Sequence, residues 1–470
     1  MRRPFSVPMA KHDIRRVFVA NRGEIAVRVI RACRALGIEA VLGVSEADVS
    51  TLGAQMADKA VVIGPPSASE SYLQADKIVA AALATDCDAI HPGYGFLSER
   101  ASFVRACQQA GLVFIGPSPE AMEAMGDKLT AVTLAQKAGV PRVPGSGALQ
   151  GLAHAKPLAA GIGYPVLIKA TAGGGGRGMR VVRDETELAA AMASATSESL
   201  AAFGDATVYL EKFIEKARHI EIQIMADAHG HVVHLGEREC STQRRHQKLI
   251  EEAPSPCLTP AMRRAMADCA VKLVRHAGYC GAGTVEFVLD ERGGGFYFLE
   301  MNTRIQVEHP VTEMVTGIDL VAEQIRVACG LPLSFTQAQV CLQGHAIECR
   351  INAEDPDQNF RPCPGLITSW AVPTGEGIRF DSHAFAGYTV PPDYDSLIGK
   401  LIVHAPTRAL AIEHMQHALR GLKVQGIATT APMHAAVLDH PAFKSGLVTT
   451  RWVEDSFLPR DRPCAQRVCA

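Results

Sequence analysis

The stretch E-M-N-T-R-I-Q-V-E, from Glu300 to Glu308, places a polar side chain at every second position. In an extended segment, successive side chains point to opposite faces. One face would then carry two carboxylates, a guanidinium and two amides, which is more charge than a structural strand needs. The stretch therefore predicts a reaction surface on a sheet. Its polar positions are Glu300, Asn302, Arg304, Gln306 and Glu308.

The residues just before this stretch predict the sheet on which it lies. G-T-V-E-F-V-L, from Gly283, and F-Y-F-L-E-M-N, from Phe296, are separated by a turn. A hairpin centred on Gly293 places Glu286 opposite Glu300. Like charges across a ladder repel, unless a cation lies between them. Oxygen-only ligands favour Mg²⁺ or Mn²⁺. The alternative is two solvated glutamates on an exposed face, and a register slip of two residues would weaken the metal interpretation.

A glycine-rich loop, Gly173 to Gly176 followed by Arg177 and Gly178, lies between two apolar runs, Pro165 to Ala170 and Met179 to Val182. It joins two strands, so it is neither a P-loop nor a dinucleotide-binding fingerprint. Consecutive glycines let backbone N–H groups approach phosphate oxygens closely. Lys169 ends the preceding strand and favours phosphate binding over a merely flexible loop. Lys128, in M-G-D-K, is a weaker candidate, because taken alone it is better explained by a surface position on a helix.

Two further polar runs accompany these motifs. S-T-Q-R-R-H-Q-K, from Ser241 to Lys248, concentrates basic groups in a short segment. Taken alone it is also compatible with a solvated loop, but beside a metal–phosphate site it would hold anionic substrates. H-A-I-E-C-R-I-N-A-E, from His345 to Glu354, again alternates polar and apolar residues, with Arg350 near its centre. It predicts a second polar strand face.

The N-terminal part alternates short apolar runs with helical spacing, as at Glu24 to Leu36. This alternation predicts an open, Rossmann-like parallel sheet. Such sheets bind ligands at the carboxyl ends of their strands, where N-R-G-E and H-P-G-Y-G-F-L-S-E follow expected strands. The predicted strands are Val17–Ala20, Glu39–Val44, Val61–Ile63, Ala89–Ile90 and Val113–Ile115.

Composition sets broad limits on the class of protein. The chain has 470 residues, 47% of them hydrophobic, with a net charge of −2 and a pI of about 6.8. This balance favours a globular protein of several domains and indicates neither a nucleic-acid nor a membrane partner. The 13 cysteines are scattered without a C-x-x-C pair. That profile is typical of reduced thiols, and we expect a cytoplasmic protein.

These motifs, in this order, resemble biotin carboxylase, the ATP-grasp component of acetyl-CoA carboxylase. The resemblance runs from about Arg16 to about Leu458. It is carried by N-R-G-E-I-A, H-P-G-Y-G-F-L-S-E, G-G-G-G-R-G-M-R-V-V, Q-R-R-H-Q-K, E-M-N-T-R-I-Q-V-E-H-P-V-T-E and E-C-R-I-N-A-E-D. The resemblance implies that MgATP phosphorylates bicarbonate to carboxyphosphate, whose CO₂ then carboxylates biotin on a carrier protein.

The resemblance implies an α/β fold of the ATP-grasp type. An N-terminal parallel sheet would be followed by a mobile lid that carries the glycine loop, and by a mainly antiparallel C-terminal domain. A linker signal at Pro141 to Gly147 supports the first division. We expect a flexible tail over 1–15, an N-terminal domain over 16–140, a lid over 141–217, a C-terminal domain over 218–458 and a second tail over 459–470.

The resemblance also assigns roles. Glu286 and Glu300, with Asn302, would bind Mg²⁺ or Mn²⁺. Glu308 would deprotonate bicarbonate, Arg350 would stabilise the biotin enolate, and Tyr94 would lie near biotin. Bicarbonate would be held by Lys248, Arg304, Gln306, Val307 and Glu308. ATP would be contacted by Lys128, Lys169, Gly175, Gly176, Glu211, Lys212, Ile214, His219, Gln243 and His246. We further expect Arg304 to lower the pKa of the carboxylate beside it.

Several points depart from the resemblance or stay open. The run Asp357 to Cys363 is longer than expected, and the glycine loop opens T-A-G. The chain has no Met-Lys dipeptide, so the A-M-K-M biotin acceptor is absent and we expect a separate biotin carboxyl carrier protein and carboxyltransferase. A homodimer is also expected. The final acceptor could be acetyl-CoA, propionyl-CoA or a 2-oxo acid. A different ATP-grasp ligase and a non-catalytic nucleotide-binding scaffold are the competing functions.

Overall fold

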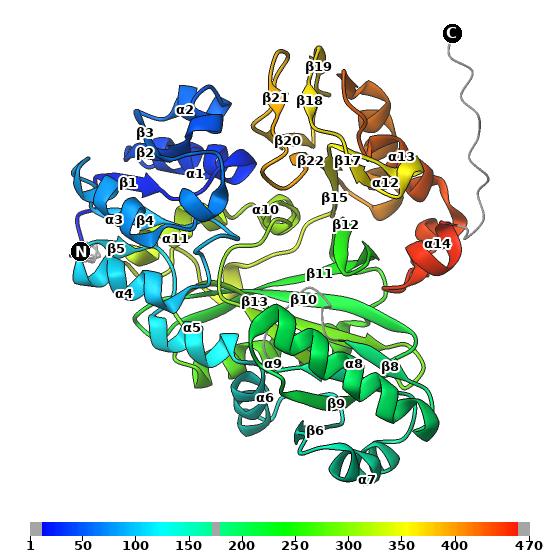
Figure 1. The fold of residues 1–470 in the computed structure, drawn as a ribbon. Coiled ribbons are helices and arrows are strands. Elements are labelled where there is room, and N and C mark those ends of the chain that lie inside the picture. The colour runs from blue at the N-terminus through cyan, green and yellow to red at the C-terminus, as the bar shows by residue number, and fades with distance from the viewer. Residues whose placement is uncertain (1–11, 172–178, 459–470) are drawn as a thin grey trace, which may run out of the picture.

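A parallel five-stranded sheet forms the N-terminal part of the computed structural model, which describes residues 12–171 and 179–458 (Figure 1). The strand order is β3-β2-β1-β4-β5. The predicted strands are therefore confirmed, and the central strand β1 pairs with β2 and β4 through short apolar runs. The strands are β1 Arg16–Val19, β2 Glu39–Ser45, β3 Lys59–Gly64, β4 Ala89–His91 and β5 Val113–Phe114.

Helices cover both faces of this sheet. Helix α1, Gly23–Ala35, buries Ile25, Val29 and Ile30 against one face, where α11, Leu320–Ala328, also packs. The buried positions of α1 follow helical spacing, which is why the sequence forms a helix here. Helices α3, Ala75–Leu83, and α4, Ala101–Gln109, cover the other face.

A small α/β unit follows, and Figure 1 shows it in the lower part of the view. Its four strands run in the order β6-β9-β7-β8. Helix α8, Glu185–Phe203, starts at an Asp184 cap and ends at Gly204, whose φ of 75° suits glycine. The loop that contains Gly175 and Gly176 lies outside the described residues. The elements are β6 Gly145–Ala148, α7 Leu152–Ile162, β7 Val166–Ala170, β8 Arg180–Val182 and β9 Val208–Lys212. Two helices, α5 Pro119–Gly126 and α6 Lys128–Lys137, connect this unit to the first sheet.

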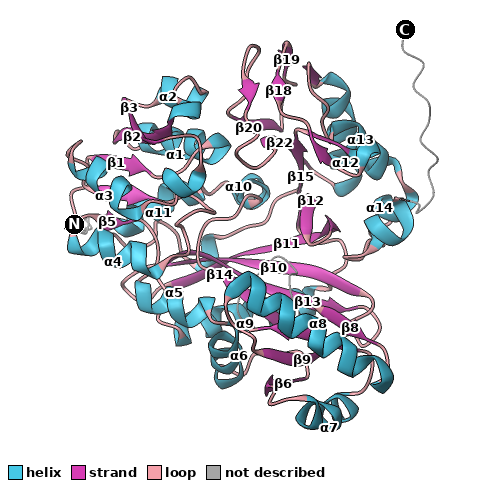
Figure 2. Ribbon diagram, viewed as in Figure 1, coloured by secondary structure: helices cyan, strands magenta, loops and turns pink. Residues whose placement is uncertain are grey.

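The largest layer is an eight-stranded sheet, which extends from the middle of the view in Figure 2 to its upper part. Its order is β14-β13-β10-β11-β12-β15-β22-β20, and every pairing is antiparallel. The mainly antiparallel C-terminal region is thus confirmed. The strands are β10 Ala217–Ala226, β11 Val232–Arg244, β12 Gln247–Ala253, β13 Gly281–Asp290, β14 Phe296–Asn302, β15 His345–Asn352, β20 Ile378–Ser382 and β22 Leu397–Ala405.

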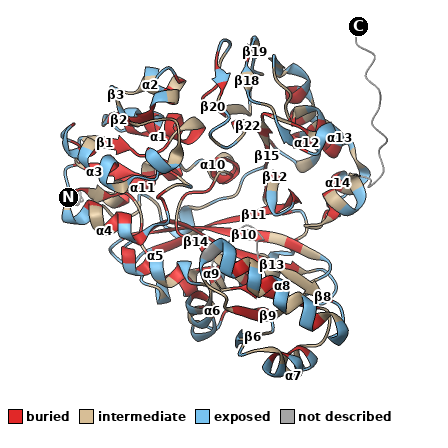
Figure 3. Cartoon of the chain, in the orientation of Figure 1, coloured by how far each residue is buried: buried red, intermediate tan, exposed pale blue. Residues whose placement is uncertain are grey.

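Helices also pack against this sheet, although sequence patterns emphasised strands after His219. Buried positions concentrate where sheet and helices meet (Figure 3). Helix α9 packs on β10 and β11, and α12 on β15 and β22. The helices are α9 Pro260–His276, α10 His309–Thr316, α12 Arg408–Gly421, α13 Ala431–Asp439 and α14 Pro441–Lys444.

The end of the expected N-terminal tail is attached to the molecule. The N–H of His12 donates to the carbonyl of Cys329 at 3.0 Å, and the side chain of Ile14 is buried. The rest of that tail, and all of the expected tail over 459–470, lie outside the described residues. Within the described ranges, no helix is long and apolar enough to cross a membrane.

Candidate active site

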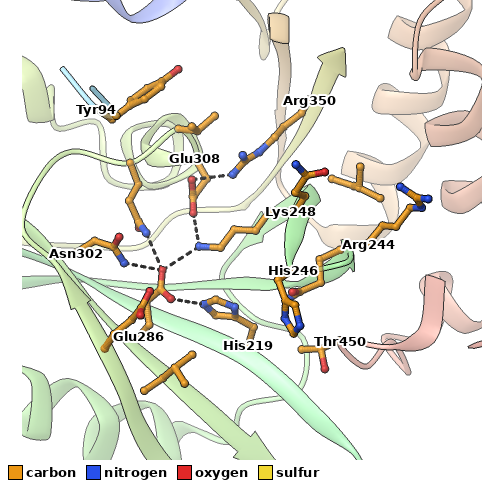
Figure 4. Close-up of a pocket in the computed structure, with 18 of the residues that line it drawn as sticks. Tyr94, His219, Arg244, His246, Lys248, Glu286, Asn302, Glu308, Arg350 and Thr450 are labelled. Carbon is orange, nitrogen blue, oxygen red and sulfur yellow. Dashed lines mark hydrogen bonds and ion pairs between the residues drawn. The ribbon is translucent and has the colours of Figure 1, made fainter. Parts of the chain in front are cut away.

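The hairpin of β13 and β14 brings Glu286 and Glu300 together, as predicted. Between Leu289 and Phe287 the strands pair in one register, and a bulge then shifts the register so that Glu286 faces Glu300. Glu286 Oε1 accepts from Asn302 Nδ2 at 2.9 Å, and Glu286 Oε2 lies 3.0 Å from His219 Nε2 (Figure 4). The side chain of Glu300 makes no hydrogen bond or ion pair with another described residue. Burial and then Glu286 raise the pKa of Glu300.

This pair has the chemistry of a divalent-cation site. Two carboxylates face each other, and Asn302, on the same strand as Glu300, lies beside them. The amide nitrogen of Asn302 donates to Glu286, and its amide oxygen accepts from Arg304 at 2.9 Å. The raised pKa of Glu300 reflects burial first and repulsion by Glu286 second, and a bound cation would oppose both effects. Hard oxygen donors suit Mg²⁺ or Mn²⁺. The residues present therefore fit the metal that the sequence predicted, and their role as its ligands stays a proposal.

The next strands continue the polar face. Glu221 on β10 is the register partner of Glu286, and it accepts from Arg238 Nε at 2.5 Å. Arg238 is fully buried, and all five of its N–H groups have partners. One of them donates to Gln306 Oε1 at 2.6 Å, so the amide nitrogen of Gln306 must point the other way, and it donates to Glu286 at 2.8 Å. The buried Arg238 thus fixes the orientation of Gln306, a residue predicted to bind bicarbonate.

Lys248, at the start of β12, is the cationic centre of the site. Its Nζ donates to Glu221 and Glu308, each at 2.5 Å, and to Glu286 at 3.1 Å (Figure 4). Burial lowers the pKa of Lys248, but three carboxylates outweigh burial and raise it well above its usual value. The turn before it contains Arg245 and His246, both with positive φ. The basic run is therefore a strand–turn–strand rather than a solvated loop.

The stretch from Glu300 to Glu308 is not one extended segment. Strand β14 ends at Asn302, and α10 begins at His309 with Glu308 as its N-cap and Pro310 at its start. Proline has no N–H to donate, and an N–H in the first turn of a helix has no intrahelical acceptor, so Pro310 suits the start of a helix and not the continuation of a strand in the sheet. The prediction of a single strand face was wrong beyond Asn302. The polar residues nevertheless meet, because the turn folds Gln306 and Glu308 back over β13.

Glu308 lies between two cations, and Arg304 is not one of its partners. Its Oε1 accepts from Lys248 at 2.5 Å and its Oε2 accepts from Arg350 at 3.0 Å. Burial raises the pKa of Glu308, but Lys248 and then Arg350 outweigh burial and hold it well below its usual range. Arg304 instead donates from Nε to Glu99 at 3.0 Å. The lowered pKa was therefore predicted correctly, but the wrong arginine was credited with it.

Lysines gather at the other end of the cleft. Lys169 Nζ donates to Glu211 at 2.7 Å, and burial together with the nearby Lys169 charge lowers the pKa of Lys128. Two ammonium groups that repel each other suit a polyanion between them. Lys212 donates to the carbonyls of Gly163 and Tyr164, at 2.7 and 3.0 Å. Its ammonium group is therefore occupied by the backbone.

One cleft of about 950 Å³ gathers all the predicted site residues that the structure describes. It lies between the N-terminal sheet, the α/β unit and the large sheet. At one wall, the hydroxyl of Tyr94 donates to Glu24, and Lys400 Nζ lies 3.1 Å from the same carboxylate. The predicted residues lining it are Tyr94, Lys128, Lys169, Glu211, Lys212, Ile214, His219, Gln243, His246, Lys248, Glu286, Glu300, Asn302, Arg304, Gln306, Val307, Glu308 and Arg350.

Several supporting residues were missed from sequence. Glu221 and Gln223 alternate with Ile220 and Ile222 on β10, so the parity argument that picked out Glu300 would have found them. Lys400 is fully buried and donates to the carbonyl of Val307 at 2.7 Å. It stands in an ordinary apolar strand, and no local pattern singles it out.

The fold and the site define an ATP-dependent ligase of the ATP-grasp type. Residues 127–336 match the ATP-binding domain of the carbamoyl-phosphate synthase L chain, residues 13–122 the biotin carboxylase N-terminal domain and residues 348–455 its C-terminal domain. The chain belongs to the biotin carboxylase family.

Individual relatives agree with this assignment. The chain is 56% identical to a biotin carboxylase of Nostoc sp., over 94% of this chain and 98% of that one. The biotin carboxylase of Campylobacter jejuni, solved with a β,γ-ATP compound, is 49% identical, with a TM-score of 0.91 over 94% of this chain and 98% of its own. The biotin carboxylase domain dimer of 2-oxoglutarate carboxylase from Hydrogenobacter thermophilus, solved with MgADP and bicarbonate, is also 49% identical. Its TM-score is 0.90, over 94% of this chain and 97% of its own.

Proposed function

We propose that this chain uses MgATP and bicarbonate to carboxylate biotin that is carried on a separate protein. The observation that carries the proposal is the position of Glu308. It is an ionised, buried carboxylate between Lys248 and Arg350, in the same cleft as the carboxylate pair and the lysine pair. A scaffold that only bound nucleotide would have no use for a buried, ionised base at this position.

Nucleotide would occupy the lysine end of the cleft. Lys128 and Lys169 would neutralise phosphate oxygens, with Gly175 and Gly176 closing over them. Glu286 and Glu300, with Asn302 nearby, would hold Mg²⁺ or Mn²⁺, which when bound offsets the charge of the transferring phosphoryl group. The remaining nucleotide contacts are proposed to be Glu211, Lys212, Ile214, His219, Gln243 and His246.

Bicarbonate would lie between Lys248 and Arg304, beside Gln306 and the backbone of Val307. It is a poor nucleophile until it loses its proton, so an ionised carboxylate within hydrogen-bond reach is required. Glu308 takes that proton, and the freed oxygen attacks the γ-phosphorus of ATP. The products are carboxyphosphate and ADP. Positioning the two anions in line is the main contribution of the surrounding cations.

Carboxyphosphate then breaks down to CO₂ and phosphate. The released phosphate takes the proton from the N1′ nitrogen of biotin, and N1′ attacks the carbon of CO₂. Charge develops on the ureido oxygen during this step, so a fixed cation beside it lowers the barrier. Arg350 is proposed for this role, because its guanidinium is held by Glu251 and Glu308 at the cleft. Tyr94 would form part of the wall near biotin.

The parent complex is proposed to be a cytoplasmic acetyl-CoA carboxylase. The chain would work as a homodimer with a biotin carboxyl carrier protein and carboxyltransferase subunits. A 2-oxo acid acceptor is the second candidate, because the domain from a 2-oxoglutarate carboxylase is as similar, at 49%, as the Campylobacter enzyme. Capture of the biotinylated partner from cells, followed by identification of the co-purifying carboxyltransferase, separates the two. Light scattering tests the dimer, and cell fractionation tests the location.

The half-reaction itself is tested by ADP formation. Purified chain with MgATP and bicarbonate should release ADP, and free biotin should increase the rate. No ADP above background in the complete mixture would overturn the proposal. ADP release at a rate that does not depend on bicarbonate would instead favour the function of another ATP-grasp ligase. The same division into an N-terminal domain 16–140, a lid 141–217 and a C-terminal domain 218–458 is proposed, and limited proteolysis with and without ATP would test the lid.

A further inference from the structure

Glu348 is a buried acid that the reaction described above does not use. It lies on β15 two residues before Arg350 and is 0% exposed. Neither of its carboxyl oxygens has a hydrogen-bond partner among the described residues. An ionised carboxylate without a partner is very costly to bury, so we expect the carboxyl group of Glu348 to be protonated and neutral.

The neighbour of Glu348 on the adjoining strand is another buried acid. Glu251 on β12 is its register partner, so the two side chains project from the same face of the sheet. Glu251 Oε1 accepts from Arg350 Nε at 2.6 Å, whereas its Oε2 has no partner among the described residues. Two carboxylates in adjacent register positions cannot both be charged without a large cost, and one proton between them removes it.

We propose that Glu348 carries a proton that keeps the positioning pair Glu251 and Glu348 at a single negative charge, and that this limits how far the pair neutralises the positive charge of Arg350. The inference rests on the proposed function. Glu251 Oε1 lies 2.6 Å from both Nε and Nη2 of Arg350, and Nη2 also donates to Glu308 at 3.0 Å, so Glu251 fixes the orientation of the guanidinium at the cleft. While the pair keeps its proton, two carboxylate charges act on Arg350, one from Glu251 and one from Glu308. Loss of the proton to solvent would add a third charge and weaken the hold of Arg350 on the biotin oxygen.

The electrostatics of the pair agree with its geometry. Burial, opposed by Lys400 and reinforced by Glu251, raises the pKa of Glu348 well above its usual value. Burial, only partly opposed by Arg350, raises the pKa of Glu251 to about 7. A raised pKa keeps an acid protonated below it and ionised above it, so the proton is lost on the alkaline side. Among the described residues, the charged or titratable groups that interact with the pair are Lys248, Arg350, Lys400, Glu308, Tyr94, Cys240 and Cys349.

Infrared spectroscopy can detect the proton on Glu348 in the absence of substrate. A protonated, buried carboxylic acid has a C=O band that is separate from the bands of carboxylates and amides. Other buried acids with a raised pKa, such as Glu239 and Glu300, can absorb in the same region, so the readout is the difference between the parent and the variant Glu348→Gln. We expect that difference to show a carboxylic-acid C=O band near neutral pH and to lose it as the pH is raised. Persistence of the full band in that variant would overturn the proposal. Because this measurement needs no substrate, it stays informative even if the proposed half-reaction fails.

Kinetics then test whether the pair acts through Arg350. The biotin-dependent rate should fall on the alkaline side in the parent protein. Glu348→Gln stays neutral at any pH, so its rate at about pH 9 relative to about pH 7 should exceed the parent ratio at least about threefold. Biotin-free, bicarbonate-dependent ATP hydrolysis should not gain this advantage, because Arg350 acts on biotin. An unchanged ratio in the biotin reaction, or an equal change in both reactions, would overturn the proposal.

Two more variants separate positioning from packing. Glu251→Gln removes the charge that orients Arg350, and we expect kcat of the biotin reaction to fall about tenfold or more while biotin-free hydrolysis changes far less. Glu239→Gln is the matched control, because Glu239 is another buried acid of the same sheet with a pKa raised by burial, held by Ser255 Oγ at 2.6 Å. It should keep the alkaline limb of the parent. A shift of that limb in the control would assign the effect to packing and overturn the proposal.

Discussion

Glu308 and Glu348 lie near the same arginine at the same depth, yet they hold opposite charge states. Both are almost completely inaccessible to water, at 2% and 0% exposure. Burial raises the pKa of each carboxyl group. Glu308 meets Lys248 and Arg350 at hydrogen-bond distance, and its pKa is held well below its usual range. Glu348 has no hydrogen-bonded cation, and its pKa lies well above that range.

The difference shows that the number of directly bonded cations, rather than depth, decides which acid can act as a base. Desolvation acts on both carboxyls, and only a short, charge-assisted contact offsets it. A base must be ionised before substrate arrives, so Glu308 can serve and Glu348 cannot. Changes that remove the base, its cation or a weaker ion pair should therefore give effects in that order.

Removing the base should have the largest effect. Glu308→Gln keeps the size of the side chain but cannot accept the bicarbonate proton, so kcat for bicarbonate-dependent ADP release should fall about 10³-fold. ATP affinity, measured by fluorescence titration with an ATP analogue, should change little. Glu123→Gln is the control, since Glu123 is an exposed carboxylate paired with Arg105 at 2.6 Å. Normal turnover in Glu308→Gln would remove Glu308 as the base.

Removing its cation should have the next largest effect. In Lys248→Met, burial is no longer opposed by the nearest charge, so the pKa of Glu308 rises toward that of Glu348. A base with a depressed pKa stays active until the pH falls through that pKa, so raising it moves the acid limb of the kcat profile upward. We expect kcat near neutral pH to fall about 10²-fold and to recover partly as the pH increases.

Charge and shape are distinguished by two companions of that variant. Lys248→Arg keeps the cation and should leave the acid limb near its original position. Lys444→Met removes an exposed lysine that pairs with Asp439 at 2.7 Å, and it should match the parent. An acid limb that does not move in Lys248→Met, in protein whose thermal unfolding remains cooperative, would contradict the electrostatic account.

The two acids also show how far sequence reasoning reaches. Alternation within a strand identified Glu300 and Arg350, because side chains on one strand face share a parity, and the hairpin register added Glu286. The single strand face ends at Asn302, where the chain turns away from the sheet toward the start of α10. Alternation also singled out Glu308, but its role as a base came only from the family resemblance.

Contacts between strands distant in sequence were beyond prediction. Lys400 supports the Val307 carbonyl from 93 residues away, and Arg304 bonds Glu99 across 205 residues. Local periodicity contains no information about such partners, so the arginine expected beside Glu308 was the wrong one. The parallel sheet and the hairpin were predictable because each follows from patterns within a few tens of residues.

The smallest effect should come from an acid with one cation and access to water. Glu99 holds Arg304 at 3.0 Å, but its side chain is 40% exposed, so solvent screens the pair. Glu99→Gln should raise KM for bicarbonate by about twofold to fivefold, through looser positioning of Arg304, with kcat nearly unchanged. Glu39→Gln, at the exposed Arg16 pair of 2.6 Å, should leave both constants at their parent values. A loss of kcat in Glu99→Gln comparable to that in Lys248→Met would mean that an exposed pair controls the base as strongly as a buried one, and the rule drawn from Glu308 and Glu348 would fail.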